Sequence, residues 1–341
     1  MRKFKIFSYA LLILILLLGT CSKRKHDLAA NLEHFFEKEK VVIAVTDSGL
    51  GGLSIMAELA EKIKEAGIFR QVDLIFFNAL FSTEGGYNSL KTSREKVLIF
   101  NSALKSLGKK SHPDLILIGC NTLSTLYGKT KFSRKTSIPV VGIIEAGTEL
   151  ISSSLRDIPD SKVIIFATQT TIEEANYQSE LRKQGFADER YITQACPELV
   201  NYIERGPESE ETAMLITAYV GEALQNLEPP QVPLFVSLNC THYGYSLPLW
   251  KKAFSEYGIS PLAYLNPNSR MIQFLLEQKK GRFQRTEINT SVLSMVEISI
   301  ERINSISAWL RTFSPQTASA LENYQLEKNL FEWKRFVADR R

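Results

Sequence analysis

The chain of 341 residues is long enough for one large domain or two of ordinary size, with a substantial hydrophobic core. Its formal charge of +4 is small for this length, and the lysines and arginines are interspersed with acidic residues. The charge pattern therefore does not indicate a nucleic-acid partner, and beyond the amino terminus the composition is that of a soluble globular protein.

The amino terminus predicts an export signal. Arg2, Lys3 and Lys5 precede an apolar stretch from Ile6 to Leu18, which is shorter than the roughly 20 residues that a membrane-spanning helix needs. We therefore favour a cleaved signal over residues 1–21 rather than a spanning anchor. The segment Leu18-Gly19-Thr20-Cys21 resembles the end of a bacterial lipoprotein signal, which predicts lipidation of Cys21 and an exported, membrane-anchored protein on the periplasmic or cell-surface side.

Residues 22–40 are expected to be a tether with some helix, because their apolar residues fall near helical spacing. Four cysteines in an exported chain suggest disulfides, but lipidation of Cys21 leaves Cys120, Cys196 and Cys240. This odd number argues against a disulfide framework and favours at least one functional or buried free thiol. An oxidising compartment is nevertheless an unfavourable place for catalytic thiols.

From residue 41 onward, short apolar runs alternate with amphipathic segments. The runs predict buried strands, and the spacing of apolar residues in the segments predicts helices. This alternation is typical of an α/β fold with parallel sheets and crossover helices. The expected strands are 41–46, 72–78, 115–119, 140–144, 162–168, 191–195 and 232–238, and the expected helices include 53–66, 93–107, 172–184 and 210–227.

Two successive runs of strands and helices each contain a cysteine segment at a comparable point. We therefore expect two pseudosymmetric lobes, each a mostly parallel sheet flanked by helices, with the active site between them. The expected first lobe is residues 41–143 plus 244–310, and the second is residues 144–243. Residues 291–310 are expected to be helical, and residues 311–341 to be a helical extension whose apolar stripe serves packing, with a partner surface as the alternative.

The two cysteine segments are Cys120-Asn121-Thr122 and Cys240-Thr241-His242. Each follows an aliphatic run that predicts a strand buried on both faces, and chemistry in parallel sheets gathers at strand carboxyl ends. A free cysteine is often only a small buried hydrophobe, so either segment alone is unspecific. Together they predict two thiols that face each other, with hydroxyl groups and amides nearby that suit a carboxylate.

The first of the expected strands leads into Asp47-Ser48-Gly49-Leu50-Gly51-Gly52. Its glycines allow backbone conformations that other residues avoid, and amides at a helix start favour an anion. A tight turn capped by Asp47 is the simpler interpretation. A nucleotide phosphate loop is not supported, because no lysine followed by serine or threonine comes after the glycines.

Taken in order, these and other motifs resemble the cofactor-independent amino-acid racemases of the glutamate racemase type, within the aspartate/glutamate racemases. The resemblance covers about residues 41–310. Its motifs are Asp47 to Gly52, Cys120-Asn121-Thr122, Ala167-Thr168-Gln169-Thr170-Thr171, Ala195-Cys196-Pro197 with Glu204-Arg205-Gly206, and Cys240-Thr241-His242-Tyr243.

The resemblance implies conversion of L-glutamate to D-glutamate without a cofactor or metal. One thiolate removes the α proton and the opposite thiol delivers another, and such enzymes supply D-glutamate for peptidoglycan and cell wall biogenesis. For Thr168 and Thr171 a turn or cap role is an alternative, and His242 could instead be a packed histidine at a strand end. The implied catalytic residues are Cys120, Cys240, Asp47, His242 and Glu204, and the implied substrate-binding residues are Ser48, Gly85, Asn121, Thr122, Thr168, Thr171 and Thr241.

The chemistry fits these residue types on independent grounds. An α hydrogen is a very weak acid, so racemisation needs a base, an opposed acid and a means of stabilising a carbanion. A thiol with a pKa of about 8.5 is partly ionised near neutral pH and is tuned by its neighbours. His242 on one side and Asp47 on the other are the natural tuners. No lysine stands in a context that suits a pyridoxal cofactor.

The chain departs from the family pattern at four positions. Asn78 stands where the family usually has an aspartate, Thr83 where it has a proline, Glu84 where it has a tyrosine, and Gly244 where it has a proline. A buried negative charge at Glu84 is expected to repel a dicarboxylate unless it is paired or protonated. Gly85 retains the amide contact. The departures therefore affect the substrate more than the reaction class.

Two alternatives remain open: an isomerase of another acidic substrate such as aspartate on the same scaffold, or a non-catalytic amino-acid-binding lipoprotein. His242 and Asp47 favour a racemase of the glutamate type over the other isomerases. The export signal favours a binding protein, but retention of both cysteines argues against it. The expected partners are a small acidic amino acid and, through the lipid anchor, a membrane, with no nucleic acid. A homodimer is left open.

Overall fold

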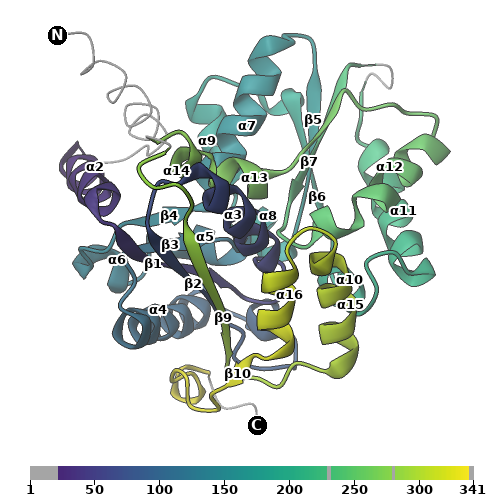
Figure 1. Ribbon diagram of the computed structural model, residues 1–341. Coiled ribbons are helices and arrows are strands. Elements are labelled where there is room, and N and C mark those ends of the chain that lie inside the picture. Colours follow the sequence, from purple (N-terminus) through teal and green to yellow (C-terminus); the bar gives the residue numbers. More distant parts are fainter. Residues whose placement is uncertain (1–21, 229–231, 279–280, 338–341) are drawn as a thin grey trace, which may run out of the picture.

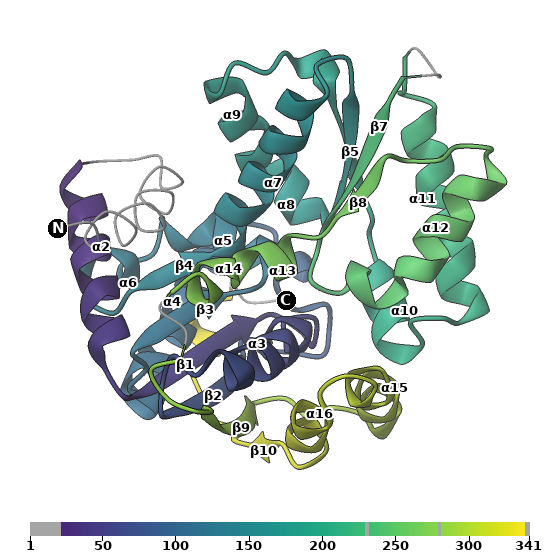
Figure 2. The same ribbon diagram turned by 45° about the horizontal axis from the view of Figure 1, so that its top comes forward.

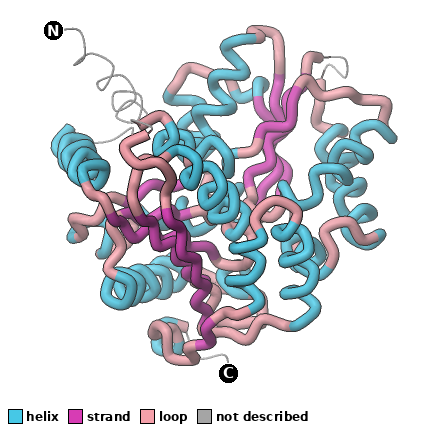
Figure 3. The backbone as a smooth tube through the Cα atoms, in the orientation of Figure 1, coloured by secondary structure: helices cyan, strands magenta, loops and turns pink. Residues whose placement is uncertain are grey.

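Two parallel sheets, each flanked by helices, organise the protein (Figures 1 and 3). The structure is a computed structural model, and it describes residues 22–228, 232–278 and 281–337. The expected α/β fold with two lobes is therefore confirmed. The predicted signal over residues 1–21, including Cys21, lies outside the described residues.

The first sheet has the strand order β10-β9-β2-β1-β3-β4, and all neighbouring strands are parallel. Successive side chains enter opposite faces, so in β1 Ile43 and Val45 join one apolar cluster and Ala44 joins the other. Helices α3 and α16 cover the first face, while α4 and α5 cover the second. The strands are β1 (Lys40–Asp47), β2 (Gln71–Asn78), β3 (Leu115–Ile118), β4 (Val140–Gly142), β9 (Glu287–Ser294) and β10 (Gln325–Leu326).

The second sheet has the strand order β6-β5-β7-β8 and is also parallel. Helices α7 and α9 cover one face, and α10, α11 and α12 cover the other. Both faces are apolar, which explains why its strands are near-continuous hydrophobic runs. The strands are β5 (Lys162–Ala167), β6 (Tyr191–Ala195), β7 (Leu234–Asn239) and β8 (Ala263–Leu265).

Most helices lie where the apolar spacing predicts them, and α3 has the expected bounds. The expected helix 172–184 is instead divided between α8 and α9, because Ala175 takes a left-handed backbone with φ of 51°. The α-helices are α2 (Ser22–Glu37), α3 (Leu53–Ala66), α4 (Ser93–Ser111), α5 (Asn121–Tyr127), α6 (Phe132–Lys135), α7 (Ile143–Asp157), α8 (Gln169–Glu173), α9 (Asn176–Lys183), α10 (Leu199–Arg205), α11 (Glu210–Leu224), α12 (Leu247–Glu256), α13 (Pro267–Met271), α14 (Gln273–Leu276), α15 (Ile300–Arg311) and α16 (Pro315–Glu322). The 3-10 helices are η1 (Gly86–Ser89), η2 (Asp188–Arg190), η3 (Tyr243–Ser246) and η4 (Lys334–Phe336).

The second lobe continues beyond the expected boundary at residue 243. Helix α12 packs on α11 and β8 pairs with β7, so the chain returns to the first lobe only after Leu265. The helix expected from residue 291 is wrong at its start, because residues 287–294 form β9. Alternating β-branched residues at 288, 290 and 292 suit a strand, and the partner that selects this conformation is β2.

The segment from residue 311 onward is not one continuous helix. Helix α16 packs on α15 and α3, and β10 pairs with β9 at the sheet edge. Beyond it, Leu330 and Phe331 are buried on the second face of the first sheet, where the Phe331 ring centroid lies 6.0 Å from that of Phe77. The apolar stripe of this segment therefore packs against the first lobe.

Helix α2, which occupies the expected tether, packs on the first lobe through its second half. Leu32, Phe35 and Phe36 are buried, and the Phe35 ring meets that of Phe69 edge-on at 5.2 Å. Asn31 Nδ2 donates to the carbonyl of Ser137 over 2.8 Å. This part of the expected tether thus belongs to the folded body. Within residues 22–228, 232–278 and 281–337, no helix combines the length and the apolar character needed to cross a membrane.

Contacts between the lobes involve distant parts of the chain. Helix α7 is the crossover from β4 of the first sheet to β5 of the second, and α13 lies against both α3 and α7 on the return. Helix α15 lies beside α10 of the second lobe (Figure 2). These contacts place the carboxyl ends of β1, β3 and β7 close enough for side chains of the two lobes to bond directly.

Candidate active site

The two cysteine segments and the glycine-rich loop come together at strand carboxyl ends. Asp47 is the last residue of β1, Cys120 caps α5 after β3, and Cys240 follows β7 directly. Thr241 Oγ1 donates to Asp47 Oδ2 over 2.8 Å, which joins the second lobe to the first. The parallel sheets therefore deliver both predicted thiol segments to one region between the lobes.

Cys120 lies at the start of α5 and is 6% exposed. Its Sγ accepts a hydrogen bond from Leu123 N–H at 3.5 Å and lies 3.1 Å from Ser48 Oγ. These contacts favour a thiolate, as helix starts generally do. Burial outweighs them and, together with the charge of Asp47, raises the pKa of the Cys120 thiol to about 12. In the substrate-free protein this thiol is therefore neutral.

Cys240 is flanked by a chain of polar contacts that ends on the other lobe. Its Sγ lies 3.7 Å from His242 Nδ1, and His242 Nε2 lies 2.8 Å from Glu204 Oε1. Burial raises the pKa of the Cys240 thiol well above its usual value. Burial also opposes ionisation of Glu204, but the hydrogen bond with His242 and the charge of Arg302 hold the pKa of that carboxyl below its usual range. Glu204 is therefore a buried carboxylate that orients His242.

The glycine-rich loop is a place of close approach between the lobes. A Cβ at Gly51 would lie 2.3 Å from Thr241 Oγ1 and 2.5 Å from His242 Nδ1. A Cβ at Gly49 would lie 2.9 Å from Glu204 Oε1. Asp47 does not cap the following helix, since the N-cap of α3 is Gly52 with no side-chain cap bond. The loop needs its glycines because second-lobe side chains pack directly onto it.

Three threonines that the sequence assigns to substrate binding form one buried hydroxyl cluster. Thr122 Oγ1 from α5 lies 2.8 Å from Thr168 Oγ1 and 3.4 Å from Thr171 Oγ1, and the last two lie 3.0 Å apart. Thr168 also caps α8 by accepting from Thr171 N–H. Thr168 therefore both caps a helix, as the alternative interpretation expected, and belongs to the hydroxyl cluster. The cluster combines hydroxyls from both lobes.

Asn121 and Gly85 occupy different surroundings. Asn121 Oδ1 accepts from Tyr177 OH over 2.6 Å, while its Nδ2 has no hydrogen-bond partner among the described residues.

Gly85 is exposed and takes a φ of +81° ahead of η1, a conformation that favours glycine. Glu84 beside it is exposed, so the expectation of a buried negative charge at that position is wrong. The surface loop keeps this carboxylate in solvent.

Two further departures from the family pattern, at residues 78 and 244, have structural roles. Asn78 Nδ2 donates to Ser294 Oγ at 3.2 Å and its Oδ1 accepts from Leu80 N–H, which ties β2 to β9 and starts the next loop. A Cβ at Gly244 would lie 3.0 Å from Asn266 Nδ2. Neither position brings a charge to the thiols.

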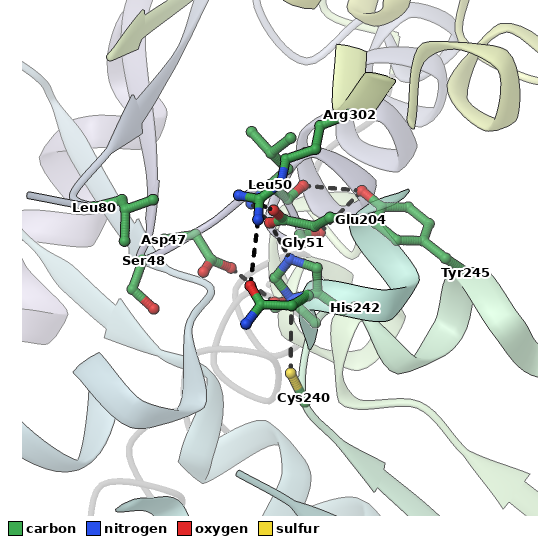
Figure 4. Close-up of polar contacts among 12 residues, drawn as sticks. Asp47, Ser48, Leu50, Gly51, Leu80, Glu204, Cys240, His242, Tyr245 and Arg302 are labelled. Carbon is green, nitrogen blue, oxygen red and sulfur yellow. Dashed lines mark hydrogen bonds and ion pairs between the residues drawn. The ribbon is translucent and has the colours of Figure 1, made fainter. Parts of the chain in front are cut away.

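Four residues near the site were missed by the sequence analysis. Arg302 Nη1 pairs with Glu204 Oε2 at 3.0 Å, and Tyr245 OH donates to the Leu50 carbonyl at 3.0 Å (Figure 4). Lys96 Nζ donates to Thr170 Oγ1 across the lobes at 2.8 Å. The fourth, Tyr87, is described next. Arg302 carries no local motif, and only the fold brings its helix to Glu204.

Tyr87 lies in η1, shares an apolar cluster with Cys120 and is 2% exposed. Its hydroxyl has no hydrogen-bond partner within the described part of the chain. Burial and the neighbouring Cys120 raise the pKa of Tyr87 well above its usual value, so the hydroxyl is a donor. The only sequence signal was its nearness to the altered Glu84 position.

The arrangement suits proton transfer at a substrate held between the lobes. Two buried thiols come from different lobes, and each has its own hydrogen-bonding side chain, Ser48 for Cys120 and His242 for Cys240. Thiols with such neighbours serve as acids and bases. The fold and the site thus define a two-lobed α/β enzyme that uses side-chain acids and bases.

Comparisons with known proteins identify the family. Residues 44–230 match the Asp/Glu/Hydantoin racemase family, which is more than half of the chain. The protein therefore belongs to that family, and the resemblance drawn from the ordered motifs is confirmed.

The relatives are named glutamate racemases. The one from Aquifex pyrophilus is 26% identical over 216 residues, covering 63% of this chain and 74% of the relative. The one from Campylobacter jejuni is 26% identical over 239 residues, covering 70% and 85%.

Solved glutamate racemase structures share the fold. That from Campylobacter jejuni has a TM-score of 0.59 at 22% identity and covers 79% of this chain and 98% of its own. That from Francisella tularensis, in complex with D-glutamate, has a TM-score of 0.59 at 20% identity and covers 80% and 94%.

Proposed function

We propose that this protein interconverts L- and D-glutamate by cofactor-independent racemisation at Cα. The observation that carries the proposal is the pair of buried thiols from different lobes, each beside a polar partner: Cys120 with Ser48 and Cys240 with His242. Membership of the racemase family and relatives named glutamate racemases support the substrate.

The proposed reaction replaces the α proton of the substrate by another proton on the opposite face and leaves no net change in the bonding of the substrate. The Cys240 proton passes to His242 Nδ1, and the resulting thiolate takes the α proton from one face of the substrate. The Cys120 thiol donates its proton to the opposite face, which completes inversion and leaves a thiolate on Cys120 and a protonated His242. A proton that passes from His242 to Cys120 through solvent then restores the starting protonation of the enzyme. The reverse direction exchanges these roles. Burial raises the pKa of Asp47, whose carboxyl accepts from Thr241, and this first-lobe residue is the auxiliary proton acceptor for Cys120 in the proposal.

The polar groups around the thiols suit an acidic amino acid. The hydroxyls of Thr122, Thr168 and Thr171 bond to one another in the free protein, and a substrate carboxylate replaces these mutual bonds. Such donors also stabilise the carbanion as charge moves onto the carboxylate. Glu84 is exposed, so it does not oppose a second carboxylate.

The test is exchange of the α hydrogen of L- and D-glutamate in deuterated water by the reduced protein. Loss of racemisation in both Cys120→Ala and Cys240→Ala, with activity kept in Cys196→Ala, is the expected result. Cys196 is a matched control because it is a buried free thiol in an apolar cluster. A panel with aspartate and neutral amino acids tests the substrate alternative. Binding without exchange of any of them would favour the amino-acid-binding lipoprotein instead.

We further propose that residues 1–21 direct export and that Cys21 carries a lipid anchor, so that the enzyme acts on free extracytoplasmic amino acids. The basic residues followed by a short apolar stretch and cysteine support this proposal. Metabolic labelling with a fatty acid, compared between the wild type and Cys21→Ser, tests it, and equal labelling would contradict it. The homodimer stays a prediction that sedimentation velocity can test.

A further inference from the structure

Arg302 connects a helix of the first lobe to the auxiliary groups of the second. It lies on α15, and its Nη1 pairs with Glu204 Oε2 of α10 at 3.0 Å (Figure 4). The Arg302 side chain is 24% exposed, whereas that of Glu204 is 3% exposed. Arg302 Nη2 also donates to Asn201 Oδ1 at 3.4 Å, which adds a second contact to α10.

Both carboxylate oxygens of Glu204 have bonding partners, and the partners of the two oxygens differ. Oε1 accepts from Leu50 N–H at 2.8 Å and lies 2.8 Å from His242 Nε2, while Oε2 faces Arg302. A carboxylate held from both ends cannot rotate without losing a buried bond. Removing the partner of a buried charge is costly, so the guanidinium stabilises the ionised form of this buried group.

The ionisation of Glu204 decides which ring nitrogen of His242 carries a proton. An ionised carboxylate only accepts, so Nε2 of a neutral His242 must be the donor, which leaves a lone pair on Nδ1. Nδ1 is the nitrogen that faces Cys240 Sγ, at 3.7 Å. A protonated Glu204 can instead donate to Nε2, and the histidine proton then sits on Nδ1, where it blocks acceptance of the Cys240 proton.

The remaining ionisable groups near Glu204 do not replace Arg302. Asp47 is another acid, and it adds negative charge to the same region. Tyr245 OH donates to the carbonyls of Leu50 and Gly51 and carries no positive charge. Arg302 is therefore the permanent cation beside the Glu204 carboxylate among the described residues.

We propose that Arg302 is a positioning residue that keeps Glu204 ionised and thereby holds His242 in the Nε2-protonated tautomer, whose Nδ1 accepts the Cys240 proton. The inference rests on the proposed function in one respect, namely that Cys240 is one of the two bases. It concerns the tautomer itself, which can be observed whether or not glutamate is the substrate.

The test is ¹⁵N NMR of the histidine rings in the full chain, with His242 assigned by its loss in His242→Gln. The wild type at pH 8 is expected to show an unprotonated Nδ1 and a protonated Nε2. Arg302→Gln is expected to shift His242 toward the Nδ1-protonated form, and Arg302→Lys to retain the wild-type form. Arg311→Gln is the matched control, because Arg311 lies on the same helix but pairs with the distant Glu322.

Glu204→Gln provides a second variant of nearly the same shape. Its amide group can donate to Nε2, so it should also place the His242 proton on Nδ1. An unchanged tautomer in a folded Arg302→Gln protein would overturn the proposal. If Arg302→Gln does not fold, Arg302→Lys provides the test, because it keeps the positive charge at position 302. Loss of the Nε2-protonated form of His242 in that variant would equally overturn the proposal.

Kinetics separate this inference from the proposed function. Arg302→Gln is expected to lower kcat for glutamate racemisation about 10²-fold with little change in KM, in line with loss of a general base, and Arg302→Lys to recover most of it. Absence of any glutamate exchange by the wild type would refute the proposed function, while the tautomer spectra would still decide the role of Arg302.

Discussion

Replacing Gly51 by alanine adds one methyl group at the point where the lobes meet. That Cβ would lie 2.3 Å from Thr241 Oγ1 and 2.5 Å from His242 Nδ1, whereas ordinary contacts begin at 3.4 Å. The second-lobe segment must therefore retreat by about 1 Å. A misplacement of about 1 Å costs on the order of 10²-fold in rate, because proton transfer depends on the alignment of the reacting atoms.

The assay is the initial rate of glutamate racemisation by Gly51→Ala, followed by polarimetry, with thermal unfolding measured in parallel. We expect kcat/KM to fall about 10²-fold while the protein remains folded. Gly128→Ala is the matched control, since a Cβ there meets nothing within 4 Å and the residue has an α-helical φ of −59°. Wild-type activity in Gly51→Ala would refute the close approach of the lobes at this loop.

Three further predictions concern a thiol, a helix and a tyrosine. Because the pKa of Cys120 is raised to about 12, its alkylation in the free protein at pH 8 should be roughly 10³-fold slower than that of a free cysteine and should rise about tenfold per pH unit toward that value. Peptide mass spectrometry measures this alkylation rate, and a rate for Cys120 that stops rising below pH 9 would contradict the prediction. Phe35→Ala should lower the free energy of unfolding in urea by about 3–5 kcal/mol, whereas the exposed Glu37→Ala should change it by less than about 0.5 kcal/mol. Tyr87→Phe should leave stability unchanged but raise KM about tenfold, since its unpaired hydroxyl is worth one hydrogen bond to a substrate; an unchanged KM would place the hydroxyl away from it.

The two lobes and the positions of the thiol segments were predictable because the local pattern of apolar residues indicates where the buried strands lie. A short aliphatic run such as Leu115–Ile118, bounded by polar and turn residues, favours a buried strand in an α/β chain, and Cys120 then lies close to its carboxyl end. The residues of β9 show the limit of this reasoning. Their apolar spacing allows helix or strand, and pairing with β2, far away in sequence, decides between them.

Side-chain partners that come from distant segments could not be predicted. Arg302 looks like any solvent-facing arginine of an amphipathic helix, and only the packing of α15 on α10 brings it to Glu204. The environment of Glu84 was misjudged for the same reason, because the direction of a loop side chain depends on how the loop folds. The apolar stripe near the carboxyl terminus was found, but its turn into β10 was not.

The surroundings of the two thiols are unequal, although each thiol follows a strand of a parallel sheet. Cys120 meets a hydroxyl and a helix start, whereas Cys240 meets an imidazole backed by an ion pair. For a racemisation, the two enantiomers have equal free energies, so the Haldane relation requires the same kcat/KM in both directions whatever the residues do. Any inequality between the two faces must therefore appear in kcat and KM together: the enantiomer with the higher kcat must also have the higher KM, in the same ratio.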